Sequence, residues 1–254
     1  MLRLVHTLVF LLPALFLAHS IKASAPKAAV YTGCKVPNTV ALTFDDGPYI
    51  NQTDISKMLV EKGAKGTFFV NGYNYECIYG KKVAARLQAT YNAGHQICSH
   101  TWDHPDLTDL NATEIQAESD KIDVALQKIL GITTQFIRPP YGSYNNMVRQ
   151  VLSNKTFIIW DFDSGDSVGA SVQESENAYD QAIAGNVTSL LALNHETEKT
   201  TVSDVLPYAI NKLQAAGYNL VTVAECLGMA PYTSVEPLGQ RDATWFCPEE
   251  RSGD

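Results

Sequence analysis

Short hydrophobic runs alternate with longer amphipathic stretches through most of the chain. Seven runs have the length of a strand, at residues 40–44, 66–70, 96–98, 135–138, 157–160, 190–193 and 220–223. Five stretches between them have the spacing of one-faced helices, at residues 53–62, 82–93, 113–130, 146–152 and 202–216. Strands that alternate with helices favour βα units and a parallel sheet.

Two local signals support these helices. In the stretch 113–130 the apolar residues Ile115, Ile122, Leu126 and Ile129 recur at intervals of seven, four and three, which places them on one helix face. A glycine follows four of the stretches, where C-terminal caps belong: Gly63, Gly94, Gly131 and Gly217.

Polar residues follow the predicted strands at their carboxyl ends. Seven strands in one domain fit either an open sheet or a barrel, and the pattern alone does not decide between them. The residues concerned are Asp45, Asp46, His100, Arg138, Asp163 and His195. Active sites of βα barrels form at this end of the strands, so the placement favours a barrel.

The two ends of the chain differ from its middle. Arg3 and the hydrophobic run 8–18, followed by small residues, predict a secretory signal peptide at residues 1–20, with its end between 18 and 25. The run is too short for a membrane span of about 20 residues. Residues 229–254 are rich in Pro, Thr and Ser and predict an irregular tail. Because that tail has no hydrophobic stretch, we expect no lipid or membrane anchor.

Charge and cysteine content narrow the environment and the partners. The formal net charge of -8 argues against nucleic acid and fits a protein that meets a neutral or cationic polymer. Five cysteines in an oxidising compartment allow at most two disulfides. Cys98 lies in an apolar run and is expected to be a buried thiol. Four Asn-x-Ser/Thr triplets are candidate glycosylation sites: Asn51, Asn111, Asn154 and Asn186.

Two segments carry candidate metal chemistry. Residues 43–48 read TFDDGP, and residues 100–104 read HTWDH. A catalytic zinc site uses three protein ligands, with His nitrogen and carboxylate oxygen at about 2.0–2.2 Å, and keeps one open position. One carboxylate and two histidines complete this set and leave the second carboxylate free as a base. Each segment alone is a weak signal, since Asp, Gly and Pro also form ordinary turns.

Three later segments make the pattern specific. They are residues 136–141 (FIRPPY), 161–166 (DFDSGD) and 191–195 (LALNH). In this order and spacing the five segments resemble the motifs of the polysaccharide deacetylases, carbohydrate esterase family 4 with its NodB-like domain. The resemblance covers residues 34–228 and is strongest to the fungal chitin deacetylases. It implies an irregular (β/α) barrel of about seven parallel strands, with the active site at the strand C-terminal ends.

The resemblance also implies roles for the motif residues. Asp46, His100 and His104 would bind one divalent metal, with zinc favoured and cobalt or nickel as alternatives. Asp45 would act as the general base, and Arg138 would pair with it.

A second group would serve the leaving amine and the sugar. His195 would be the general acid, oriented by Asp166 or, alternatively, by Asp163. Tyr141 would offer a backbone N–H to the oxyanion, Leu193 would line the acetyl pocket, and Tyr75 would stack on a sugar. The family usually has an aromatic residue after the second Asp of the fourth motif, but Ser167 stands there.

The resemblance extends to the cysteines. Cys34 matches a position that bridges to Cys226 in fungal relatives, which would tie the start of the barrel to its end. Cys77 and Cys247 then remain to form a second bridge.

The expected function is that of a secreted, monomeric hydrolase that removes N-acetyl groups from chitin or chitooligosaccharides. The alternatives are an acetylxylan esterase or a peptidoglycan deacetylase of the same fold. A third alternative is a catalytically silent carbohydrate-binding relative. Such a relative would be expected to lack a metal ligand or the base, and the sequence retains all of them.

Overall fold

The computed structural model describes residues 26–247. The predicted signal peptide and the last seven residues of the predicted tail lie outside this part. No helix within it is long and apolar enough to cross a membrane.

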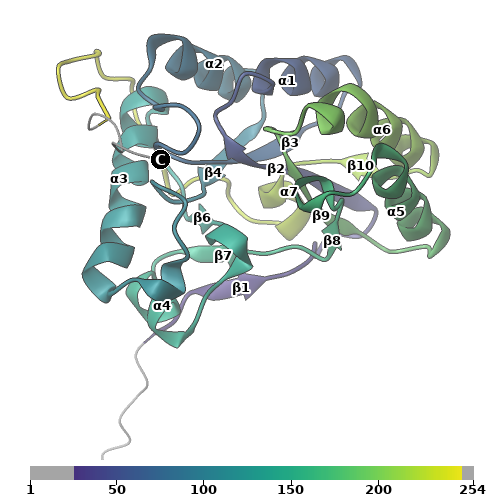
Figure 1. Cartoon of the computed structure of the whole chain (residues 1–254), viewed down its shortest axis with the longest axis horizontal. Coiled ribbons are helices and arrows are strands. Elements are labelled where there is room, and N and C mark those ends of the chain that lie inside the picture. Colours follow the sequence, from purple (N-terminus) through teal and green to yellow (C-terminus); the bar gives the residue numbers. More distant parts are fainter. Residues whose placement is uncertain (1–25, 248–254) are drawn as a thin grey trace, which may run out of the picture.

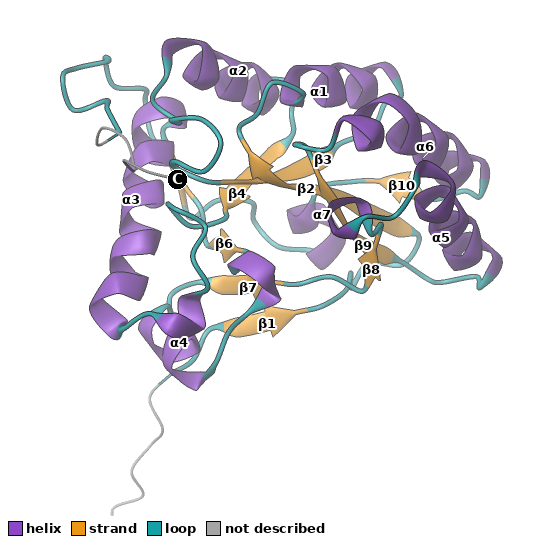
Figure 2. Cartoon of the chain, in the orientation of Figure 1, coloured by secondary structure: helices purple, strands orange, loops and turns teal. Residues whose placement is uncertain are grey.

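A curved sheet of parallel strands forms the centre of the molecule, with helices on its outside (Figures 1 and 2). Its strand order is β1-β7-β6-β4-β3-β2-β9-β8, and β10 pairs with β2. Their bounds are β1 Ala29–Tyr31, β2 Thr39–Gly47, β3 Gly66–Val70, β4 Gln96–Ser99, β6 Phe136–Ile137, β7 Thr156–Ile158, β8 Phe162–Asp163, β9 Leu190–His195 and β10 Asn219–Leu220. The order ends at β1 and β8, so the sheet is a barrel that is open between these two strands.

The predicted barrel is confirmed, and all seven predicted strands are present. The sheet gains two strands that the sequence did not indicate, β1 and β8. Each is three residues or fewer and is partly exposed: β1 is the short apolar segment AVY, and β8 has only one apolar residue, so neither has the length of the predicted strands. A separate antiparallel pair joins β5 (Ile132–Thr133) to β11 (Ser234–Val235).

The predicted helices are also present, with ends within one residue of those expected, except that α6 begins four residues later than the last predicted helix. They are α1 Gln52–Glu61, α2 Lys81–Asn92, α3 Ala112–Leu130, α4 Asn146–Val151 and α6 Leu206–Ala215, the last preceded by a π-helical turn at Thr201–Val205. The sequence did not indicate α5 (Val172–Ala184) because it buries only Ser175 and Tyr179. It also did not indicate α7 (Val223–Leu227). The last predicted strand was extended to residue 223, whereas β10 ends at Leu220.

Helix α3 shows how local signals set these boundaries. Asn111 caps its first turn, and Glu114 completes a capping box. The helix ends at Gly131, whose φ of 70° is left-handed and therefore suits glycine. Its four predicted core residues are fully buried. The other three predicted cap glycines also have positive φ.

Strand β2 is the structural link between the core and the site. Its first six residues are buried and pack in the core of the sheet. It pairs with β3 on one side and β9 on the other, and the β9 register sets Asp45 opposite His195. Burial of β2 therefore fixes the position of the two carboxylates at its carboxyl end.

Both predicted disulfides are present, and Cys98 is a buried free thiol. The Cys34–Cys226 bridge joins the segment before β2 to α7. The Cys77–Cys247 bridge holds the end of the described tail, where the Trp245 ring packs 5.9 Å from that of Tyr79. The predicted tail is irregular but is attached to the domain by this bridge and by β11.

Replacing Cys34 with Ser is expected to lower the free energy of unfolding without changing the chemistry of the site. The bridge closes a loop of 192 residues, for which the chain-entropy description gives about 5 kcal/mol. Urea denaturation of C34S and wild type measures the difference. An unchanged midpoint would show that the bridge contributes nothing to stability.

The four candidate glycosylation sites differ in their surroundings. Asn111, Asn154 and Asn186 are exposed. Asn51 is half-buried, and its amide nitrogen donates a hydrogen bond of 2.9 Å to the Glu196 carbonyl. A glycan on Asn51 would be attached to a nitrogen that already donates within the fold, whereas the other three side chains are exposed.

Candidate active site

A cavity of about 480 Å³ lies at the carboxyl ends of the strands. Eight of the predicted site residues line it: Asp45, Asp46, Tyr75, His100, His104, Tyr141, Leu193 and His195. Arg138 and Asp166 do not line the cavity and instead contact residues that do. The fold therefore brings together five segments that are far apart in the sequence.

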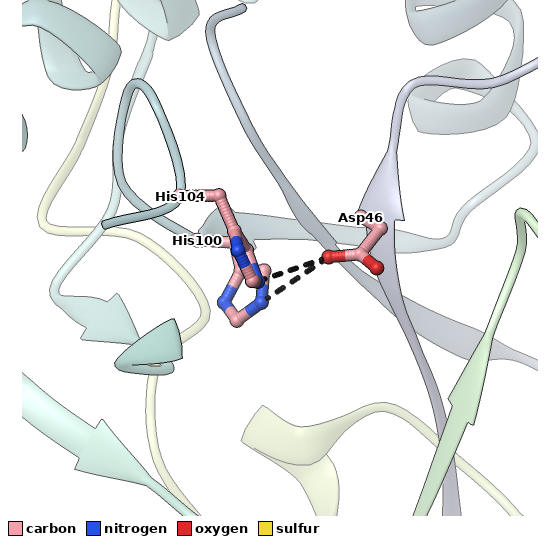
Figure 3. Close-up of side chains that lie close together, drawn as sticks. All are labelled: Asp46, His100 and His104. Carbon is pink, nitrogen blue, oxygen red and sulfur yellow. Dashed lines mark ion pairs between the residues drawn. The ribbon is translucent and has the colours of Figure 1, made fainter. Parts of the chain in front are cut away.

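Asp46, His100 and His104 form the candidate metal centre (Figure 3). Asp46 lies at the end of β2, and both histidines come from the segment after β4. Asp46 Oδ1 lies 3.2 Å from His104 Nε2 and 3.6 Å from His100 Nε2. The three ligand atoms are all within 4.8 Å of one another. Two imidazole nitrogens and one carboxylate oxygen on one side of a cavity are a donor set suited to zinc.

Three further observations fit a metal at this position. Asp46 Oδ1 is buried, yet within the described residues it has no hydrogen-bond partner. His100 Nδ1 donates to the Arg138 carbonyl at 2.7 Å, which leaves the lone pair of Nε2 directed at Asp46. Burial lowers the pKa of His100 to about 3, and burial together with His100 lowers that of His104 to about 4. Both rings are therefore neutral near pH 7, which is the form that binds metals.

The backbone of the site is strained at several positions. Asp46 has a φ of 72°, and His104 and Tyr141 each have a φ of 59°. Non-glycine residues held in this left-handed region cost of order 1–3 kcal/mol, and such strain gathers at functional sites. Three cavity residues that share this rare conformation support a functional reading of the cavity.

Asp45 is held by a buried arginine. Arg138 is fully buried and donates from Nη1 to Asp45 Oδ1 and to Thr43 Oγ1, both at 2.7 Å. Its Nε and Nη2 donate to the carbonyls of Ile158 and Ile159. Burial raises the pKa of Asp45, and the Arg138 charge opposes that rise. The other carboxylate oxygen, Oδ2, lies 3.7 Å from His100 Nε2, beside the metal ligands.

His195 lies beside Asp45 and is oriented by Asp166. Its Nδ1 donates to Asp166 Oδ1 at 2.7 Å, and its backbone N–H donates to Oδ2 at 2.8 Å. Thr201 Oγ1 donates to the same Oδ2, so Asp166 is itself fixed. Burial lowers the pKa of His195, but the hydrogen bond to Asp166 and the charge of Asp45 outweigh burial and raise it to about 9.

Asp163, the alternative partner of His195, has a different role. Its side chain is exposed and accepts a hydrogen bond from the Gly165 backbone N–H. Of the two carboxylates left open by the sequence, Asp166 is the one in contact with the histidine.

The sequence of this chain matches the family described as polysaccharide deacetylase over residues 32–159. A chitin deacetylase from Pestalotiopsis sp is 36% identical over 218 residues, which cover 82% of this chain and 70% of that relative. The chain belongs to the polysaccharide deacetylase family. A probable peptidoglycan-N-acetylglucosamine deacetylase from Arthroderma benhamiae is 33% identical over 80% of this chain, which spans 47% of that relative.

The fold of this polysaccharide deacetylase agrees with solved structures. The chitin deacetylase from Colletotrichum lindemuthianum superposes with a TM-score of 0.78 at 28% identity. The match covers 83% of this chain and 96% of that one. The likeness therefore includes nearly the whole of that enzyme's solved domain.

The sequence missed part of the cavity wall of this deacetylase. Trp160 lines the cavity, and a Cβ on Gly142 would lie 2.9 Å from its ring. Trp160 comes two residues after β7, at the carboxyl end of a strand, so its position was the available signal. Glu198 also lines the cavity. It follows His195 by three residues, in a segment with no pattern that would single it out.

The predicted substrate contacts Tyr75 and Tyr141 are open to solvent. Tyr75 is 54% exposed and its ring packs 5.3 Å from that of Tyr49, while Tyr141 is 69% exposed beside the His104 ring. Ser167, where the family usually has an aromatic residue, lines the cavity together with Val168, which is 79% exposed. This side of the pocket is therefore wider than an aromatic wall would make it.

Proposed function

We propose that this chain is a secreted, metal-dependent hydrolase that removes N-acetyl groups from N-acetylglucosamine units of chitin or chitooligosaccharides. One observation carries the proposal. The metal-ligand triad, Asp45 with Arg138, and His195 with Asp166 surround a single cavity. The two relatives named as chitin deacetylases support the choice of substrate. The two disulfides support secretion.

Asp46, His100 and His104 would hold one divalent ion, with zinc favoured and cobalt or nickel also suited to these donors. Such an ion would polarise the acetyl carbonyl and would lower the pKa of a bound water to about 7. Asp45 takes the proton from the attacking water. Its raised pKa suits this role, because a base works best when its pKa approaches the working pH.

The leaving group determines the need for His195. An amide nitrogen leaves as an amine only after it is protonated, so the site must hold an acid on that side. With a pKa of about 9, His195 carries its proton near pH 7 and can give it to the nitrogen from Nε2. Asp166 fixes the ring by holding Nδ1. The Tyr141 backbone N–H would stabilise the oxyanion, and Leu193 and Trp160 would enclose the acetyl group.

A second candidate, a peptidoglycan deacetylase, is supported by the Arthroderma benhamiae relative of that name. It differs from the first in the polymer that carries the acetamide and uses the same chemistry. An acetylxylan esterase is less well supported, because an alkoxide depends less on a firmly held acid than an amide nitrogen does. The complete triad and base argue against a silent relative.

Substrate choice is tested by acetate release from fully acetylated chitooligosaccharide, peptidoglycan and acetylxylan, assayed side by side. We expect the highest kcat/KM on the chitooligosaccharide, measured as free acetate. A higher value on peptidoglycan would favour the second candidate. A higher value on acetylxylan would contradict a site built for the amide.

A further inference from the structure

Glu196 lies beside the active site, and its carboxyl group is fully buried. The proposed reaction does not involve this group. Glu196 directly follows His195, yet it does not line the cavity. Carboxylates are almost never fully buried unless paired. Both oxygens of Glu196 accept hydrogen bonds from neutral donors, the Tyr49 backbone N–H at 2.5 Å and Gln52 Nε2 at 3.2 Å. Burial raises the pKa of Glu196, and these two hydrogen bonds oppose the rise.

The hydrogen-bond partners of Glu196 lie in one short segment, residues 45–52. Besides the two bonds to its carboxylate, its backbone N–H donates to the Asp45 carbonyl at 3.3 Å. Its own carbonyl accepts from Asn51 Nδ2 at 2.9 Å. Glu196 therefore makes four hydrogen bonds to the segment that carries the base and a metal ligand.

Gly47 shows how closely the carboxylate approaches this segment. A Cβ at position 47 would lie 2.0 Å from Glu196 Oε1, nearer than any real contact. The carboxylate therefore lies directly against the backbone of the residue that follows Asp46. Asp46 itself has a left-handed φ of 72°. Strain of this kind persists only where the surrounding structure fixes the backbone. Glu196 fixes it by its hydrogen bonds to Tyr49 and Gln52, which follow Gly47 in the chain.

We propose that Glu196 is a positioning residue whose buried carboxyl group holds the Asp45–Asp46 end of β2 at a fixed distance from His195. Because Glu196 is the next residue after His195, one residue anchors both the acid and the end of β2. The base, the metal ligand and the acid then keep their spacing around the cavity. The activity readout rests on the proposed function, whereas the metal and stability readouts do not.

The variant E196Q tests the carboxylate with little change in volume. Its amide oxygen can still accept the Tyr49 N–H, but its NH₂ group then meets the NH₂ of Gln52. If the Gln52 amide turns over to accept, its NH₂ moves to the buried position of Oε1, where the described residues offer no hydrogen-bond partner. A misplacement of the order of 1 Å can cost roughly 100-fold in rate. We expect kcat to fall by about that factor on both an acetamide and an aryl acetate, with KM little changed. The visible absorption spectrum of the Co²⁺-loaded protein should also change.

The double variant Q52E/E196Q exchanges the amide and the carboxylate across the pair. A donor again meets an acceptor, and the Tyr49 N–H keeps an oxygen partner. We expect this variant to recover most of the lost kcat and the wild-type cobalt spectrum. Recovery would not follow if Glu196 only filled space.

D123N is the matched control. Asp123 forms a partly buried ion pair of 2.5 Å with Lys155, and neither residue lines the cavity. We expect a lower melting temperature, with the kcat and cobalt spectrum of the wild type. Wild-type kcat and spectrum in E196Q would overturn the proposal, as would an exchange variant that folds but stays as impaired as E196Q.

The test still decides if E196Q does not fold or if the wild-type protein proves inactive. If E196Q does not fold, the exchange variant decides alone: wild-type kcat and spectrum support the proposal, and loss of both overturns it. If wild-type protein releases no acetate from any acetamide, the proposed function fails. The cobalt spectra and melting temperatures then still decide the role of Glu196.

Discussion

Replacing Asp45 with Asn is expected to leave the metal bound and to lower the rate of acetate release by roughly 10²–10⁴, the usual effect of losing a general base. The change removes the charge and one acceptor oxygen but keeps an oxygen for Arg138 Nη1, which is 2.7 Å away. The buried arginine therefore retains a hydrogen bond. Metal content of the dialysed protein and the rate on chitooligosaccharide are measured together.

His104→Ala is the matched comparison, because it removes a ligand and leaves the base. His104 Nε2 lies 3.2 Å from Asp46 Oδ1, so its loss should weaken metal binding directly. D45N should lose turnover at full occupancy, whereas H104A should recover part of its activity as the metal concentration rises. Equal loss of metal in the two variants would show that base and ligand have been assigned wrongly.

Replacing His195 with Ala should slow hydrolysis of an acetamide far more than hydrolysis of an activated aryl acetate. A positioned acid contributes roughly 10²–10⁴ in rate. A phenolate leaves without a proton, so the aryl ester needs only the metal and Asp45, which H195A retains. Asp166→Asn should show the same bias more weakly, because it keeps the ring but alters its main hydrogen bond. Equal losses on both substrates would assign His195 a structural role.

The pH dependence gives a second test of the same acid. His195 has a pKa raised to about 9, so its protonated form is present below that pH and is lost above it. Acetamide hydrolysis should therefore decline as the pH rises through about 9. In D166N the decline should begin at lower pH, because Asp166 is the main cause of the raised pKa. A decline at the same pH in D166N would mean that another group titrates.

Much of this site was predictable because its chemistry lies at the ends of buried strands. The hydrophobic run before Asp45 and the run before His100 each predicted a strand, and parallel strands bring their carboxyl ends together. The choice between Asp163 and Asp166 was not predictable from pattern. Both lie in one short irregular segment, and only the turn at Gly165 determines which carboxylate meets the ring.

The parts that the sequence missed share a physical cause. Helix α5 buries a serine and a tyrosine in place of an aliphatic stripe, so hydrophobic periodicity does not reveal it. Trp160 and Glu198 reach the cavity from loops, whose course depends on tertiary contacts. Glu196 was also missed, because a Glu in sequence is expected to be exposed. Its burial depends on Tyr49 and Gln52, about 150 positions earlier in the chain.

We expect removal of N-acetyl groups to require a metal held by Asp46, His100 and His104. Acetate release from fully acetylated chitooligosaccharide tests it most directly, with wild-type protein before chelator dialysis, after it, and after zinc or cobalt is returned. We expect acetate production to stop on dialysis and to resume with metal, and we expect D45N with metal to release acetate roughly 10²–10⁴ more slowly than wild type. Undiminished acetate release from protein verified as metal-free would contradict it.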